Sequence, residues 1–208
     1  MERYVRKQEV VNALISGIGI LFGVSGLPVL IAIGTVNGNT PGIIGAGIYA
    51  FCFLMLFTSS TIYHISLEPA IRNLFKKLDH IIIYFLIAGT YTPLLLIFLN
   101  NTFGISLLVI LWSLAFIGIF FKMRYTGRFE VVSTIIYLLM GWIMVSGGRR
   151  FFDAMPADVL IMICIGGGLF TVGVVFYLWD KYLYTHAVWH GFVLAGAVCH
   201  YVAVLLSL

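Results

Sequence analysis

Apolar residues dominate this chain in long runs that short polar breaks separate. A helix that crosses the hydrocarbon core of a bilayer needs about 20 predominantly apolar residues. We expect a transmembrane helix in each of seven stretches: 10–34, 42–65, 79–99, 104–121, 130–147, 157–179 and 186–207. The fifth stretch is short for a crossing. The pattern predicts an all-α bundle of seven transmembrane helices, forming one integral membrane domain over residues 1–208.

Lysine and arginine in the short connections predict the direction of these helices. Cytoplasmic loops of membrane proteins carry an excess of both residues. With the N-terminus placed inside, all 12 Lys and Arg residues except Arg149 and Arg150 fall on the cytoplasmic side. An odd number of crossings then puts Leu208 outside. We therefore expect a multi-pass protein of the inner (plasma) membrane with a cytoplasmic N-terminus.

Composition supports a membrane protein and excludes one class of partner. Hydrophobic residues make up 62% of the chain and charged residues 10%, whereas soluble domains average about 25% charged residues. The net charge of +4 is spread over loops, which argues against nucleic acid as a partner and fits contact with anionic membrane lipids. Cys52, Cys164 and Cys199 lie in apolar runs without a CxxC pair, and we expect them to be buried packing residues.

Polar and ionisable residues inside the predicted spans gather at one end of the bundle. Ser60 and His64 lie one helical turn apart near the cytoplasmic end of the second span. Asp79 opens the third span from the same side, and His186 and His190 open the seventh. An ionisable residue in a membrane span is a functional hypothesis by default. The predicted topology brings these side chains from three helices to one depth.

His186 and His190 have the spacing of a metal-binding pair, because residues four apart project from one helix face. His64 would supply a third imidazole. A catalytic zinc ion typically has three protein ligands and a water, whose pKa it lowers to about 7. Asp79 could hold that water or take its proton, and Ser60 could orient a substrate carbonyl. The sequence thus predicts zinc on His64, His186 and His190.

Plainer interpretations exist for the same residues. Two histidines one turn apart can form a polar contact between helices, and Asp79 can be the N-cap of the third helix. His80 should point about 100° away from Asp79, and we interpret it as structural or interfacial. His200 lies ten residues beyond His190, about 15 Å deeper. It cannot share a metal with His190, and it either bonds another helix or faces a cavity.

The motifs around these residues resemble the hemolysin III family, the bacterial branch of the adiponectin/progestin receptor superfamily, which is related to alkaline ceramidases. The matching segments are STIYH at 60–64, LDH at 78–80, GTYTP at 89–93, YLLMGW at 137–142, HAVWH at 186–190 and LAGAVCH at 194–200.

This resemblance covers nearly the whole chain. It implies seven helices and a zinc ion near the cytoplasmic face, held by His64, His186 and His190. It also implies that Asp79 and Ser60 lie beside the zinc-bound water. Many relatives carry a histidine where Ser16 stands, and this departure concerns the polar residues of the first span rather than the zinc ligands.

Three functions stay open from the sequence. One is zinc-dependent hydrolysis of a lipid amide or ester at the inner leaflet, since receptor relatives are associated with hydrolysis of ceramide-type amides. The second is pore formation or cytolysis, which the family name suggests, although a pore favours a continuous polar stripe rather than polar residues at one end. The third is a sensor or receptor with a structural zinc, and bacterial members have also been linked to lipid homeostasis.

Overall fold

The computed structural model describes residues 2–125, 128–179 and 182–208, and every regular element in these ranges is a helix. Six of the helices are long and apolar enough to cross a membrane, while α5 has only 12 residues. The chain is therefore an all-helical, multi-pass membrane bundle. Its elements are α1 (Glu2–Val36), α2 (Thr40–Ile65), α3 (Pro69–Phe98), α4 (Thr102–Tyr125), α5 (Glu130–Gly141), α6 (Ile143–Gly147), α7 (Arg149–Phe152), α8 (Ala157–Leu178) and α9 (Thr185–Ser207).

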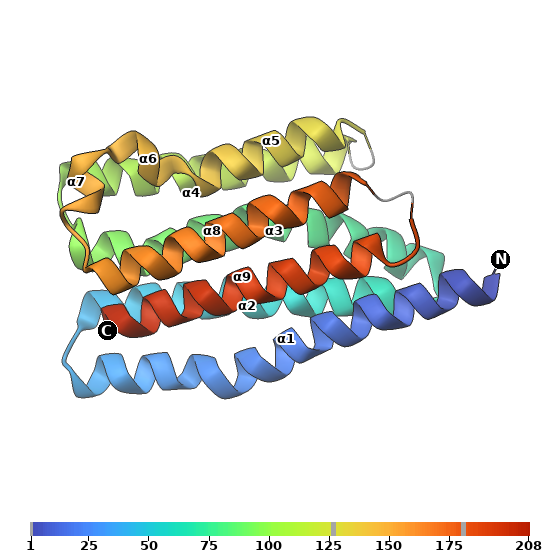
Figure 1. Cartoon of the computed structure of the whole chain (residues 1–208), viewed down its shortest axis with the longest axis horizontal. Coiled ribbons are helices and arrows are strands. Elements are labelled where there is room, and N and C mark those ends of the chain that lie inside the picture. Colours follow the sequence, from blue (N-terminus) through green and yellow to red (C-terminus); the bar gives the residue numbers. More distant parts are fainter. Residues whose placement is uncertain (1, 126–127, 180–181) are drawn as a thin grey trace.

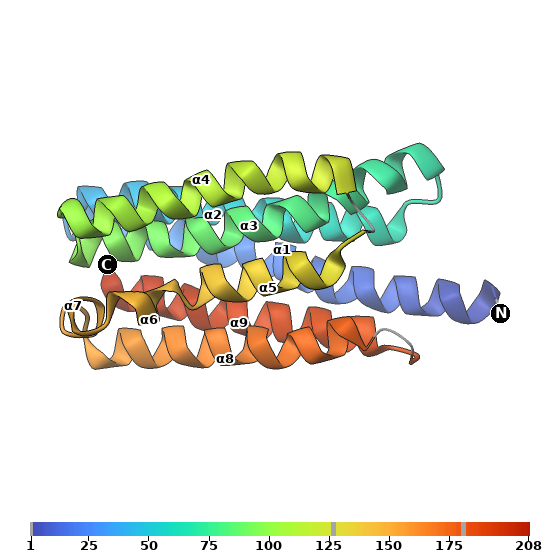
Figure 2. The same cartoon turned by 90° about the horizontal axis from the view of Figure 1, so that it is seen from above.

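The long helices run along one common direction (Figure 1). The start of α1 and the turn between α2 and α3 lie at one end of the bundle, which we call the N-terminal end. The chain's C-terminus and the short helix α7 lie at the opposite end (Figures 1 and 2). Helices α5 and α6 follow one another along the same direction (Figure 2). Residues near the ends of α2, α3 and α9 can therefore meet at the N-terminal end.

The outer surface of the bundle is apolar. Leu21 on α1, Phe120 on α4 and Leu139 on α5 are exposed by 72%, 78% and 68%. Soluble monomers rarely expose large contiguous apolar patches, whereas lipid tails are as apolar as leucine side chains. This surface fits a hydrocarbon solvent.

Helix α3 begins ten residues earlier than the hydropathy pattern predicts, at Pro69 instead of residue 79. Proline is favoured in the first turn of a helix because that turn's N–H groups have no helical partner. The basic segment that follows Pro69 continues the helix outside the apolar window. Asp79 consequently lies well inside α3, and the interpretation of Asp79 as an N-cap is wrong. Helix α1 likewise begins at Glu2.

The predicted fifth span, 130–147, is interrupted. Trp142 has φ −97° and ψ 16° and separates α5 from α6. The carbonyl of Gly141 accepts a hydrogen bond from the hydroxyl of Tyr91 at 2.5 Å, and the indole N–H of Trp142 donates to Thr171 Oγ1 at 3.0 Å. A helix break at membrane depth is tolerated where neighbouring helices satisfy the backbone in this way. Side chains of α3 and α8 thus hold the break in place.

Close packing of α2 on α3 positions one side of the site. A Cβ atom on Gly45 would collide with the backbone of Pro93, so only glycine permits this approach. The expected use of glycine for helix packing is confirmed at this position. Because α2 and α3 are in close contact, Ser60 and Asp79 can face the same internal space.

The cysteines follow the expectation only in part. Cys52 is buried, Cys199 is intermediate and Cys164 is exposed on the outside of α8. The prediction of burial is therefore wrong for Cys164. A span that is apolar on all sides does not indicate which face is turned inward.

Candidate metal centre

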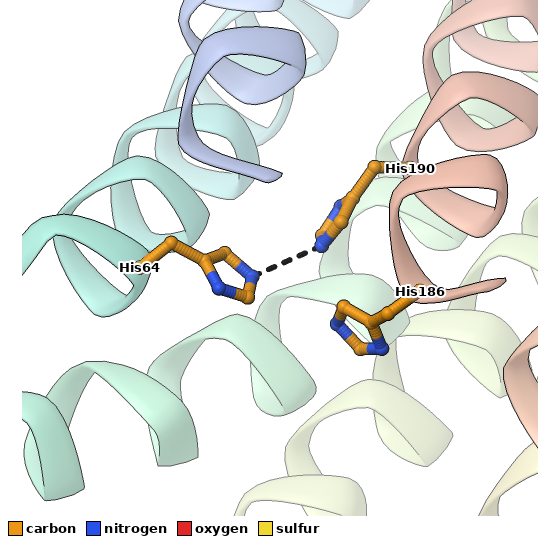
Figure 3. A group of neighbouring side chains, drawn as sticks. All are labelled: His64, His186 and His190. Atoms are coloured by element: carbon orange, nitrogen blue, oxygen red, sulfur yellow. Dashed lines mark hydrogen bonds between the residues drawn. The ribbon is translucent and has the colours of Figure 1, made fainter. Parts of the chain in front are cut away.

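Three histidines meet at the N-terminal end of the bundle (Figure 3). His64 lies in the last turn of α2, and His186 and His190 lie at the start of α9. One ring nitrogen from each lies within 4.8 Å of the others, and the two Nε2 atoms of His64 and His190 are 3.0 Å apart. His64 and His190 are buried. The structure thus brings together the three residues that the sequence proposes as metal ligands.

The local geometry of α9 explains the pairing of its two histidines. The helix begins after Tyr184, whose φ of 67° turns the chain sharply. His186 and His190 follow one turn apart with ring centroids 4.8 Å from each other, and the ring centroid of His64 is 5.5 Å from that of His186. The two helices therefore present their imidazoles to one point.

These residues fit a metal ion by chemistry and by spacing. Imidazole nitrogen suits zinc and related transition metals. Ligand nitrogens on a tetrahedral zinc, at 2.0–2.1 Å from the metal, would lie about 3.3 Å apart. The observed separations, from 3.0 Å up to 4.8 Å, bracket that value. The buried cluster of His64, His186 and His190 could hold a metal ion.

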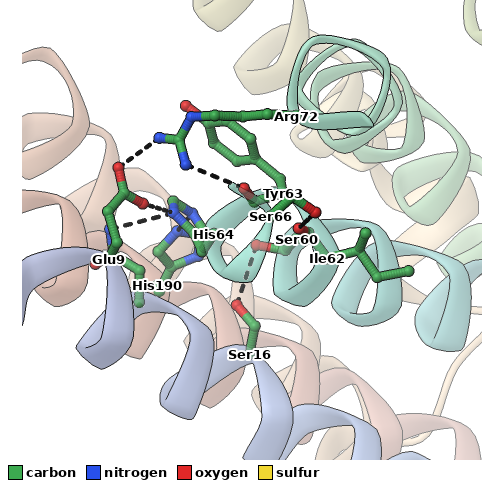
Figure 4. A network of polar contacts seen from close by, with 10 residues as sticks. Glu9, Ser16, Ser60, Ile62, Tyr63, His64, Ser66, Arg72 and His190 are labelled. Atoms are coloured by element: carbon green, nitrogen blue, oxygen red, sulfur yellow. Dashed lines mark hydrogen bonds and ion pairs between the residues drawn. The ribbon is translucent and has the colours of Figure 1, made fainter. Parts of the chain in front are cut away.

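Glu9 on α1 fixes the orientation of His64 (Figure 4). Its Oε2 lies 2.6 Å from His64 Nδ1, and its Oε1 accepts a hydrogen bond from Arg72 at 2.5 Å. A carboxylate can only accept, so Nδ1 of His64 carries the proton and Nε2 is left as the metal-binding lone pair. Carboxylates that orient histidine ligands in this way commonly raise metal affinity. Asn12 Nδ2 lies 3.4 Å from the same Nδ1.

Arg72 links Glu9 to the end of α2. Its guanidinium group donates to the carbonyl oxygen of Tyr63 at 3.2 Å and lies 4.7 Å from the centroid of the Tyr63 ring. The side chain of Glu9 is therefore held from two sides, by an imidazole and by a guanidinium. This network ties α1, α2 and α3 together at the N-terminal end.

Sequence analysis missed Glu9, Asn12 and Arg72. The spacing of Glu9, Asn12 and Ser16 places them on one face of a helix, and this polar face was the available signal. Ser16 donates to Ser60 Oγ at 3.0 Å, both side chains being buried. The first helix therefore contacts the site through Ser16.

Ser60 and Asp79 lie with His190 in the wall of one cavity between α2, α3, α5, α8 and α9. Ser60 is 2% exposed and Asp79 is 9% exposed. The space in this cavity that the centre of a water molecule can occupy is about 100 Å³. It reaches His200, ten residues along α9 from His190, and so extends about 15 Å along the bundle. Most of its lining is apolar, including Leu86, Leu94, Ile163 and Val193.

His80 is not among the residues that line this cavity and belongs to a second polar cluster. Its Nδ1 lies 3.5 Å from Glu130 Oε2. The same oxygen accepts from Lys122 at 2.7 Å and from the hydroxyl of Tyr177 at 3.0 Å. These contacts join α3, α4, α5 and α8, so the structural interpretation of His80 is confirmed.

The fold and the site together define a class: a multi-pass helical membrane protein with a buried histidine cluster at one end that could hold a metal. A profile of the haemolysin-III related family matches residues 4–201. The chain belongs to this family, as the sequence motifs predict.

Curated relatives agree with this assignment. The chain is 39% identical to the hemolysin-3 homolog of Bacillus subtilis, over 96% of this chain and 93% of that protein. It is 37% identical to hemolysin-3 of Bacillus cereus, over 96% and 91% of the two chains. The human monocyte to macrophage differentiation factor is 30% identical over 77% of this chain and 69% of its own length. No solved structure matches the chain significantly.

Removing any one of the three histidines should abolish stoichiometric metal binding. In protein purified in detergent without chelators, we expect zinc in the parent and its loss in His64→Ala, His186→Ala and His190→Ala, because two imidazoles bind the ion far more weakly. Elemental mass spectrometry measures the content. His80→Asn, which changes a histidine outside the cluster, is the matched control and should keep the metal. A folded parent without any bound metal would contradict the assignment.

Loss of the carboxylate on His64 should weaken the metal site without removing it. We expect Glu9→Ala to lower zinc affinity by about 10–100-fold, the usual effect of deleting a group that orients a ligand. Competition with a zinc chelator of known affinity measures the change. Ser25→Ala, on an exposed part of the same helix, serves as control. Equal affinities of Glu9→Ala and the parent would show that His64 needs no support from α1.

Proposed function

We propose that this protein is a zinc-dependent hydrolase that cleaves a lipid amide or ester at the cytoplasmic side of the membrane. The observation that carries the proposal is the shared cavity wall of Ser60, Asp79 and His190. Ser60, Asp79 and His190 stand at one end of this space, and most of the remaining lining is apolar. Ligand sites commonly combine an apolar lining with a few placed polar groups. A lipid with a carbonyl group and a long chain has the matching shape and polarity.

His64, His186 and His190 would hold the zinc ion, and Glu9 would keep the first of them in the binding tautomer. When bound, zinc supplies Lewis acidity: it lowers the pKa of a coordinated water to about 7 and polarises a carbonyl oxygen. The apolar wall of the cavity excludes bulk water from the scissile bond and aligns the chain of the substrate.

Asp79 would transfer the proton during the reaction. Its carboxylate would accept a proton from the attacking water, whose oxygen forms the bond to the acyl carbon. The C–N or C–O bond then breaks, and Asp79 would pass the proton to the leaving amine or alcohol. Ser60 already receives a hydrogen bond from Ser16, so its own proton can be donated to the substrate carbonyl oxygen.

Two other functions receive less support. The relative from Bacillus cereus is named hemolysin-3, but a mostly apolar cavity offers no continuous polar path for a pore. A structural zinc would be expected to have four protein ligands. Within the described ranges the cluster consists of His64, His186 and His190 alone, which favours a position open to water.

The cytoplasmic location of the site belongs to this proposal. We infer seven crossings, with α5 and α6 forming the fifth, and a cytoplasmic N-terminus. Arg149 and Arg150 lie on α7 at the opposite end of the bundle from the start of α1 (Figure 1). Basic side chains near the N-terminal end are Arg72, Lys76 and Lys77 at the start of α3, and Lys122 and Arg124 at the end of α4. This distribution follows the excess of positive charge in cytoplasmic loops.

Reporter fusions should reveal this orientation in bacterial cells. Alkaline phosphatase fused after Leu208 should be active, since it is active only outside the cytoplasm, and a green fluorescent protein at the same point should be dark. Fusions after Tyr125, at the end of α4, should give the opposite pair of signals. Reversed signals at both points would place the histidine cluster on the outer side and contradict the proposed location.

Replacing Asp79 should stop hydrolysis while leaving zinc in place. With zinc-loaded protein in vesicles that contain ceramide or an ester lipid, we expect Asp79→Asn to release fatty acid about 10²–10⁴-fold more slowly, because it lacks the proton acceptor. Mass spectrometry of the released acid measures the rate, and zinc content is measured in parallel. Asp158→Asn, at the far end of α8, is the matched control. The proposal would be contradicted if Asp79→Asn released fatty acid as fast as the parent. It would also be contradicted if the zinc-loaded parent released no fatty acid from any lipid offered.

A further inference from the structure

His200 lies in the wall of the cavity far from the histidine cluster. Its Nε2 is 3.4 Å from the carbonyl oxygen of Ile163 on α8, and its ring centroid is 5.4 Å from that of Phe170. Gly166 makes room for the ring, since a Cβ there would overlap the imidazole. Both sequence alternatives for His200 are thus confirmed, because it bonds another helix and also faces a cavity.

The contact with Ile163 fixes which nitrogen of His200 carries the proton. A carbonyl oxygen only accepts hydrogen bonds, so Nε2 must be the donor. In a neutral imidazole the other nitrogen, Nδ1, is then an acceptor. Over residues 2–125, 128–179 and 182–208 the bond to Ile163 is the one hydrogen bond that His200 makes. An acceptor without a partner in an apolar space is unfavourable, so Nδ1 favours a ligand that brings a donor.

The other polar side chains in this part of the cavity wall already donate their hydrogens to acceptors within the protein. The Tyr91 hydroxyl donates to the carbonyl oxygen of Gly141, and the Thr171 hydroxyl donates to that of Gly167. The indole N–H of Trp142 donates to Thr171. The wall there consequently offers acceptors and few donors. A complementary ligand group must donate a hydrogen bond, as a hydroxyl does.

We propose that the part of the cavity around His200 is a subsite for a hydroxyl group carried part-way along a lipid chain. The hydroxyl donates to His200 Nδ1, about 15 Å along the bundle from His190. The class of ligand is therefore a mid-chain hydroxylated acyl lipid. This inference rests on the proposed lipid occupant of the cavity and does not require that hydrolysis occurs.

A matched pair of fatty acids tests the subsite directly. Ricinoleate differs from oleate by one hydroxyl part-way along the chain. Displacement of a fluorescent fatty acid from the purified, zinc-loaded full chain measures the affinity of each. We expect ricinoleate to bind roughly 2- to 12-fold more tightly, the range given by a net hydrogen bond. An acid hydroxylated beside its carboxyl group should gain nothing over its unsubstituted counterpart, because its hydroxyl lies too far from His200.

Variants assign the preference to His200. His200→Phe should bind oleate and ricinoleate alike, while His200→Gln, which keeps an acceptor, should retain part of the preference. Cys164→Ala, on the exposed side of α8, should behave as the parent. A role in helix packing alone predicts the same stability loss in both His200 variants and no discrimination between the two lipids.

Each contrary result has a distinct meaning. Equal affinity of the parent for oleate and ricinoleate overturns the subsite, and that comparison needs no variant to fold. Binding of neither acid overturns it as well, together with the lipid occupant. A preference that survives in His200→Phe assigns the hydroxyl to another group and also overturns it. If the protein hydrolyses no lipid but still binds ricinoleate more tightly than oleate, the proposed enzyme activity is rejected and the proposed subsite is supported.

Discussion

A polar group buried in a lipid-embedded bundle must find its partner within the protein, because the hydrocarbon around it supplies none. This constraint organises the structure. Glu9, His64 and Arg72 satisfy one another at the N-terminal end, and Lys122 and Glu130 do the same a few helices away. Each cluster draws its members from different helices. The charged groups inside the bundle therefore also fix how the helices are arranged.

Much of this arrangement could be predicted from sequence because membrane helices obey simple rules. Hydropathy identifies the apolar helices, and the spacing of His186 and His190 places two imidazoles on one face. The prediction that His64 joins them needed only the assumption that helix ends alternate sides. Ser60 and Asp79 were found by the same reasoning, and the structure places both on the cavity wall.

The remainder depended on contacts that periodicity does not contain. Glu9 was overlooked because hydropathy treats a charge near the end of a span as a boundary, whereas its side chain contacts His64 on the neighbouring helix α2. The early start of α3 escaped detection because the helix continues beyond its apolar part. The break at Trp142 depends on Tyr91 and Thr171 in other helices. Hydropathy or periodicity evaluated along a single segment detects none of these partners, because they lie in other segments of the chain.

His64 and His190 are separated by 126 positions in the chain. During synthesis, α2 enters the membrane long before α9, so the cluster is incomplete until the last helix has been inserted. A metal bound there would join an early helix to the final one, and such a link restricts the conformations of the unfolded chain most when the loop it closes is long. Metal loading would then report that the whole protein has been made and assembled, and a prematurely terminated chain could not acquire it.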